Sequence, residues 1–294
     1  MDIITILRIV LGIIAVVTTL LIVKDCIGHR EEFEGTMGQY IILAIIGFLT
    51  NFFDTWGIGS FAPTQAAFKF TKTSSDETVP GTLNVGDTLP VSVEALLFLG
   101  FVDIDPLTLV LMLVAAAAGA FVGASIVSKW NIKTVRIVMA CVLVACSIVT
   151  VMKTMGVGPF GVAGEALGLS GAKLIIGVVC NFFFGALMMV GFGLYAPCTA
   201  LVAMLGMNIG TAFPIMMGSC ALLMNVSVFK FVQEGKYDRR ATLMLMFPGA
   251  LGAFAAYKIA CWFSLTTLTY IVCVVMLITA AMYMKDAKKD EKKA

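Results

Sequence analysis

Two segments of this 294-residue chain share a pattern of glycine, alanine and proline that could create a binding site. Both read Gly-x-Gly-x-x-Ala-Pro, at residues 57–63 and 191–197, and both lie inside long apolar stretches. Glycine lets the backbone leave helical geometry, and proline favours the first turn of a new helix. Each segment therefore predicts a broken helix, whose free N–H groups and positive dipole end could bind a small anion. The alternative interpretation is a close helix crossing, which small residues also allow.

Three carboxylic side chains lie within apolar stretches near the first of these segments. Asp54 directly precedes it, and Asp87 and Glu94 share the next apolar stretch. Charged groups inside a bilayer are costly and indicate function, and a buried carboxyl group can take up and release a proton. We therefore expect proton coupling at these three residues. The alternative is a structural hydrogen bond or a position at the membrane edge.

Further polar residues and glycines surround the two segments and could contact a ligand. Amides and hydroxyls can donate hydrogen bonds to an anion, although hydroxyls in membrane helices often bond their own backbone. The candidate substrate-binding residues are Asn51, Gly57, Gly59, Ser60, Thr82, Asn84, Asn181, Gly191, Gly193, Tyr195, Cys198 and Ser219. The chain has a single histidine and no Cys/His cluster with metal-ligand spacing, so we expect no metal and no cofactor.

The composition indicates the environment in which these residues act. Hydrophobic residues make up 60% of the chain and charged residues 13%, whereas a soluble domain carries about 25% charged residues. This balance predicts an integral membrane protein and argues against soluble enzymes and secreted disulfide scaffolds. A formal net charge of +2 provides no basic field for nucleic acid.

The apolar stretches are long enough to cross a bilayer, for which a helix needs about 20 residues. They must be helical, because lipid cannot satisfy the backbone groups of an open sheet edge. The fold class is therefore an all-α polytopic membrane protein with eight or nine transmembrane helices. The expected spans are 3–23, 40–68, 81–101, 107–128, 134–152, 172–205, 209–232, 241–257 and 262–284.

The chain contains an internal repeat. Asn-Phe-Phe precedes both glycine segments, Gly100-Phe101-Val102-Asp103 is similar to Gly235-Lys236-Tyr237-Asp238, and Gly-Ala-Phe occurs at 119–121 and at 252–254. Equivalent residues lie about 130 to 135 positions apart, so two related halves are the best explanation. Two such halves are the usual plan of a secondary transporter. The number of spans favours a parallel repeat, but re-entrant glycine segments would change the count and allow an inverted repeat.

The repeat and the loops divide the chain into five parts. They are a first span with a polar loop (1–38), a first repeat (39–152), a glycine-rich linker (153–171), a second repeat with the last span (172–284) and a charged tail (285–294).

Basic loop residues indicate the orientation in the membrane. Lys236, Arg239 and Arg240 share a side with the basic tail, and the positive-inside rule then predicts a cytoplasmic C-terminus in the cell membrane. The same span count places Lys129, Lys133 and Arg136 on the opposite side.

Over roughly residues 40 to 280, the chain resembles the sulfite exporter TauE/SafE family, also called the toluene sulfonate uptake permeases. Four motifs of each half carry this resemblance: the glycine-rich break, a small-polar stretch (79–84 or 218–219), the Gly-x-x-Asp loop and the Gly-Ala helix. The resemblance implies two related four-helix halves and transport of sulfite, sulfonates or other small anions. Ser60-Phe61 and Leu194-Tyr195 replace the later glycines of the family's break, and Asp54 and Asp87 depart from its general pattern.

These observations predict a secondary transporter rather than an enzyme. The expected substrate is a small anion, sulfite or another sulfur oxyanion or organosulfonate, moved by a proton or ion gradient because the chain lacks a P-loop for ATP. The expected partners are this substrate and the lipid bilayer, without nucleic acid. The alternatives are an anion channel, and a membrane enzyme or sensor without transport.

Overall fold

The structure, a computed structural model, describes residues 3–100, 102–158, 164–259 and 266–291. Phe101, Gly161, the start of the expected span 262–284 and the end of the tail lie outside the described residues. The helices are α1 (Ile3–Gly28), η1 (Arg30–Glu32), α2 (Met37–Asp54), α3 (Phe61–Thr71), α4 (Val79–Gly86), α5 (Thr88–Phe98), α6 (Pro106–Val127), α7 (Ile132–Met155), α8 (Gly171–Met188), α9 (Tyr195–Met204), η3 (Ile209–Thr211), α10 (Ala212–Glu234), α11 (Arg239–Ile259) and α12 (Thr266–Glu291).

The expected all-α polytopic membrane fold is confirmed. Among the described residues, seven helices are long and apolar enough to cross a membrane, namely α1, α2, α6, α7, α8, α10 and α11. Their outer faces carry large apolar side chains, such as Val16 and Leu20 of α1, which are 60% and 64% exposed. Such faces suit contact with lipid rather than with water.

Both glycine segments break their helices, as the sequence predicts. Each long helix of the expected spans 40–68 and 172–205 is followed by a short one, α3 with 11 residues and α9 with 10 residues. At about 1.5 Å per residue, a helix of that length covers about half of a hydrocarbon core that is about 30 Å thick. Each short helix is therefore too short to complete a crossing, and it forms a hairpin with the long helix before it.

Hydrogen bonds show that each hairpin enters and leaves at the same end of the bundle. Arg240 donates to the carbonyl of Glu34, just before α2, at 2.5 Å and to that of Thr73, just after α3, at 2.7 Å. In the second half, Lys173 at the start of α8 donates to the carbonyl of Leu205, directly after α9, at 3.0 Å. Both hairpins are therefore re-entrant.

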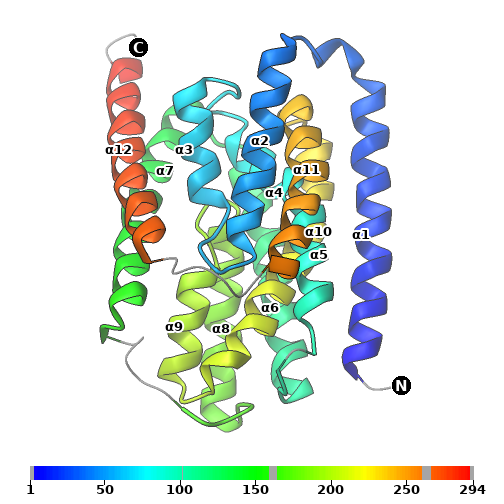
Figure 1. Cartoon of the computed structure of the whole chain (residues 1–294), viewed down its shortest axis with the longest axis vertical. Coiled ribbons are helices and arrows are strands. Elements are labelled where there is room, and N and C mark those ends of the chain that lie inside the picture. Colours follow the sequence, from blue (N-terminus) through cyan, green and yellow to red (C-terminus); the bar gives the residue numbers. More distant parts are fainter. Residues whose placement is uncertain (1–2, 101, 159–163, 260–265, 292–294) are drawn as a thin grey trace.

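The two halves have opposite orientations. The α2–α3 hairpin enters from the end of the bundle that holds the C-terminus, and the α8–α9 hairpin enters from the end that holds the N-terminus (Figure 1). The repeat is therefore inverted. The span count had favoured a parallel repeat because it treated each hairpin as a crossing.

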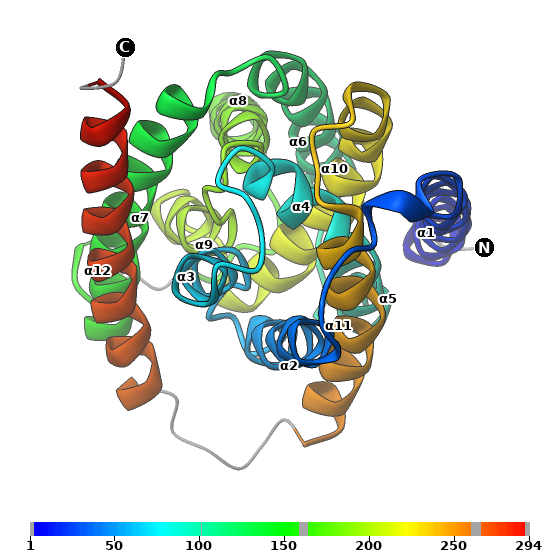
Figure 2. The same cartoon turned by 90° about the horizontal axis from the view of Figure 1, so that it is seen from above.

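Helices of one half pack against helices of the other half. α2 packs against α11, α6 against α8, and α7 against α12 (Figure 2). Glycines permit the closest of these crossings: a Cβ added at Gly119 would lie 1.8 Å from the carbonyl oxygen of Phe182, and one added at Gly252 would lie 2.2 Å from that of Phe48. The repeat thus supplies both members of a symmetric pair of tight crossings.

The expectation that Arg136 and its neighbouring lysines lie opposite to the tail is wrong. Arg136 contacts Asp76 at 2.7 Å, and Lys69 bridges Asp76 at 2.7 Å and Asp286 at 2.8 Å. The α7 start, the α3 end and the tail therefore share one end, because the first hairpin does not cross. The hydrogen bond from Lys69 lowers the pKa of Asp286, which lies beyond the expected last span.

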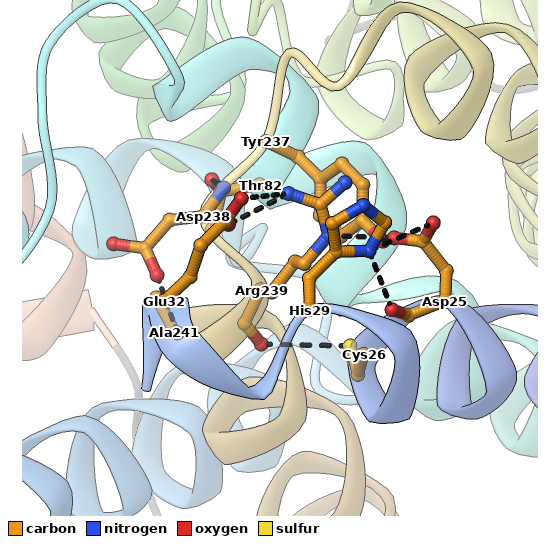
Figure 3. A network of polar contacts seen from close by, with 9 residues as sticks. All are labelled: Asp25, Cys26, His29, Glu32, Thr82, Tyr237, Asp238, Arg239 and Ala241. Carbon is orange, nitrogen blue, oxygen red and sulfur yellow. Dashed lines mark hydrogen bonds and ion pairs between the residues drawn. The ribbon is translucent and has the colours of Figure 1, made fainter. Parts of the chain in front are cut away.

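Helix α1 lies outside the repeat and is held at this same end by a charged cluster (Figure 3). Arg239 reaches Asp25 at 2.7 Å and both oxygens of Glu32 at 2.6 Å. Tyr237, in the loop before α11, donates its hydroxyl hydrogen to Asp25. Burial, together with this hydrogen bond, raises the pKa of Tyr237, so its hydroxyl stays protonated.

Candidate functional site

The tips of the two hairpins meet at a small, partly open cavity. Gly59, Phe61 and Ala62 line it from the first hairpin, and Gly193, Tyr195, Ala196 and Pro197 line it from the second. The cavity volume is about 30 Å³, which is room for about two water molecules. Helices α7 and α12 close the cavity with Cys146, Val149, Thr150 and Met276.

The start of each short helix presents free main-chain N–H groups at this cavity. Those of Phe61 and Ala62, and those of Tyr195 and Ala196, donate no hydrogen bond within the described chain, as is usual in the first turn of a helix. The glycines make the sharp turns before them: Gly57, Gly59 and Gly191 have φ values of 82°, 94° and 92°, which favour glycine. Two positive helix ends therefore converge on one point.

Asp54 makes the two helix starts different. Its oxygen Oδ1 accepts the N–H of Ser60 at 2.7 Å, so the start of α3 already has an acceptor. At the start of α9, no side chain of the described residues caps the N–H groups, although the hydroxyl of Tyr195 donates to Glu94. The start of α9 is therefore the position with donors available to another anion.

Glu94 links the two hairpins. One carboxylate oxygen accepts the hydroxyl of Thr55 in the first break at 2.8 Å, and the other accepts that of Tyr195 at the start of α9 at 2.7 Å. Glu94 is fully buried. A change in its protonation would therefore alter hydrogen bonds to both hairpins.

Asp87 lies at a kink between α4 and α5. Pro90 explains this kink, because proline has no N–H to donate to the carbonyl four residues earlier. Asn51 donates to Asp87 Oδ1 at 3.0 Å. In the second half, Asn181 donates to Ser219 at 2.9 Å. The three predicted carboxyl residues are all buried and near one another, and none forms an ion pair within the described chain.

The structure gathers part of the predicted substrate-binding set at the cavity. Gly59, Gly193 and Tyr195 line it, and Ser60 lines a second small hollow beside it, together with Asp54 and Cys220. Gly57 and Gly191 shape the turns but point their carbonyl groups to Lys153 and Gln65.

Other predicted residues lie away from the cavity. Asn84 donates to the carbonyls of Pro80 and Met188, and Cys198 is buried within α9. Thr82 accepts the N–H of Asp238 at 2.8 Å, so it ties α4 to the α10–α11 loop at the end of the bundle.

Sequence reasoning missed Lys153 and Gln65, which both contact carbonyl groups of the glycine breaks. Lys153, at the end of α7, donates to the carbonyl of Gly57 at 3.2 Å and forms no ion pair within the described residues. Gln65 donates to the carbonyl of Gly191 at 3.0 Å. Its one-turn spacing from Thr150 would place Lys153 on the same face of a helix, but the glycine-rich sequence after it favours a linker.

Comparison with known proteins finds no matching family model, no similar curated protein and no similar solved structure. The resemblance to the TauE/SafE family therefore stays a prediction, and function is inferred from the geometry of the hairpins.

Proposed function

We propose that this chain is a secondary transporter that carries a small anion through the membrane. The proposal rests on the two half-length helices. Both start at one small cavity, and they belong to hairpins that enter from opposite ends of the bundle. Discontinuous helices at the interface of inverted repeats are a usual way to build a transport site.

The start of α9 favours an anion when the neighbouring carboxyl groups of Glu94 and Asp54 are protonated. Its free N–H groups at Tyr195 and Ala196 carry the positive end of the helix dipole. Lys153, one turn after the lining residue Thr150 on α7, donates to the carbonyl of Gly57 in the first break. An oxyanion accepts hydrogen bonds at several oxygens, so N–H groups and a hydroxyl suit it without a direct arginine contact.

The resemblance to sulfite exporters favours a sulfur oxyanion or an organosulfonate as the substrate. Sulfite, thiosulfate and methanesulfonate share anionic oxygens that accept hydrogen bonds, and they differ in size and in their apolar part. The apolar lining from Phe61, Cys146 and Met276 suits a substrate with an uncharged end.

Alternating access follows from the inverted repeat. The cavity is too small for such an anion in this conformation, so a hairpin has to move before the substrate enters. Because each hairpin opens toward a different end of the bundle, movement of one or the other exposes the site to one side at a time. Proton binding at the buried carboxyl groups supplies the coupling to a gradient.

Substitution of Gly193 tests the site. A Cβ at Gly193 meets no atom within 4 Å, and its backbone does not require glycine. Gly193→Leu therefore fills the cavity without backbone strain, and we expect it to abolish counterflow of sulfite, thiosulfate and methanesulfonate in proteoliposomes.

The matched control is Gly12→Leu on α1, where an added Cβ also meets nothing within 4 Å. This variant should transport like the unmodified chain. Normal counterflow by Gly193→Leu would contradict the proposed site. Uptake that neither saturates nor accelerates when substrate is present on the far side would instead indicate an anion channel.

A further inference from the structure

The hydrogen bonding between Asn51 and Asp87 leaves one oxygen atom of each side chain unused. Both side chains are fully buried, Asn51 one turn before the first break and Asp87 at the α4–α5 kink. Asn51 uses both of its N–H hydrogens, one toward Asp87 Oδ1 at 3.0 Å and one toward the carbonyl of Gly47 at 3.0 Å. Its donor capacity is therefore complete.

The second oxygen of each group lacks a partner. Among the described residues, Asn51 Oδ1 and Asp87 Oδ2 are both buried without a hydrogen bond, although the Ser60 side chain lies near Asp87. Leaving a buried acceptor unpaired is unfavourable, because the group has lost its hydrogen bonds to water. Both atoms are acceptors, so one hydrogen between them would satisfy both at once. A carboxylic acid and a primary amide can form such a ring, in which each group donates one hydrogen bond to the other.

The charges around Asp87 agree with this arrangement. Asp87 forms no ion pair within the described residues, and the carboxyl groups of Asp54 and Glu94 lie within electrostatic range of it. An uncompensated carboxylate there would be costly. Two free oxygens are enough to hold a proton, whereas a hard metal cation takes about six oxygen ligands.

We propose that Asp87 binds the coupling proton on Oδ2 and donates it to Asn51 Oδ1, an inference that rests on the proposed transport function. Loss of the proton removes one hydrogen bond of the ring and leaves a carboxylate oxygen facing an amide oxygen. Asn51 then transmits the change, because Asp54, on the next turn of α2, holds the start of α3 through Ser60. Asp87 is thus the proton site, and Asn51 is a positioning residue.

The second half of the chain provides an internal comparison. Asn181 corresponds to Asn51 in the repeat, and it donates to Ser219 as Asn51 donates to Asp87. Ser219 fills the place of Asp87 with a hydroxyl group, which does not ionise at physiological pH. The second half therefore has no ionisable group in this position. The single proposed site, in the first half, carries one proton in each cycle.

Gradient-driven transport of methanesulfonate tests the proposal, because this strong acid stays ionised. With the membrane potential clamped, one proton per anion predicts accumulation of about tenfold per pH unit. Asp87→Asn, in which the amide reproduces the protonated acid, should keep counterflow and lose this accumulation. Asp103→Asn, the same substitution at an exposed loop carboxyl group, should keep both. Full accumulation by Asp87→Asn would overturn the proposal.

Infrared spectroscopy of the purified protein decides the proposal independently of transport. Near neutral pH, the unmodified chain should show a carboxylic acid C=O band that is absent in Asp87→Asn and shifted in Asn51→Leu. If Asp87→Asn removes no such band, the proton site is wrong even where transport occurs. A missing counterflow in the unmodified chain contradicts the proposed function, whereas the infrared band still reports whether Asp87 holds a proton.

Discussion

At the scale of single residues, the buried polar groups form specific pairs instead of a general polar lining. Glu94 joins Thr55 to Tyr195, Asp54 holds the N–H of Ser60, and Asp87 pairs with Asn51. Each carboxyl group thus contacts a break or the helix turn beside one. Protonation of these groups and the conformation of the hairpins are therefore linked through direct hydrogen bonds.

Tyr195→Phe should destabilise the protein. The substitution leaves one oxygen of the buried Glu94 without its donor, which costs about 1–3 kcal/mol. We expect a lower Tm in detergent for this variant. Tyr283→Phe is the matched control, because the hydroxyl of Tyr283 is buried without a hydrogen bond and its removal should be neutral or stabilising. Equal Tm changes for the two variants would show that the Glu94 contact adds no stability.

At the scale of elements, glycine has two separate roles in this chain. At Gly57, Gly59 and Gly191 it allows positive φ values and so ends a helix inside the protein. At Gly119 and Gly252 it stays helical and lets two backbones touch. Both interpretations considered for glycine in the sequence, the break and the close crossing, therefore occur, each at different positions.

Gly119→Ala should force α6 away from α8. The added Cβ would lie 1.8 Å from the carbonyl oxygen of Phe182, and overpacking of this kind costs about 1–3 kcal/mol. Thermal unfolding in detergent should show the loss. Gly12→Ala, on a helix face where the Cβ meets nothing within 4 Å, should keep or raise Tm, since alanine favours helix. An unchanged Tm in Gly119→Ala would mean that the crossing relaxes without cost.

At the scale of the whole molecule, the inverted repeat sorts the charges. The end that holds the C-terminus carries Lys69, Arg136, Lys236, Arg239 and Arg240, each in an ion pair or a hydrogen bond with a neighbouring loop or helix. The other end holds Arg8 and Lys173, which donate to the carbonyl groups of Leu99 and Leu205. The positive-inside rule therefore predicts that the end with more basic residues faces the cytoplasm.

Cysteine labelling in intact cells measures this orientation. In a background in which the eight native cysteines are replaced, Asp103→Cys should react with a membrane-impermeant maleimide from outside. Lys72→Cys, at the other end, should react only after lysis. The reverse pattern would place the C-terminus outside the cytoplasm and would contradict the proposed orientation.

The sequence by itself determined the membrane fold class, the repeat and the two helix breaks. Apolar content and span length set the first, because a chain with so few charges has no other stable environment. Glycine and proline at 57–63 and 191–197 set the breaks, since their backbone preferences act locally. The three buried carboxyl residues were also visible in the sequence, because charges within apolar stretches are rare.

Only the tertiary structure decided how these parts are placed. The sequence cannot show whether a broken stretch crosses or turns back, because the direction of α3 and α9 depends on packing between the halves. For the same reason it left the repeat as parallel or inverted and placed Arg136 at the wrong end. The pairing of Asn51 with Asp87, and of Glu94 with Tyr195, joins residues 36 and 101 positions apart. Such contacts are fixed by how the helices pack and not by local sequence, so they became visible only in the folded chain.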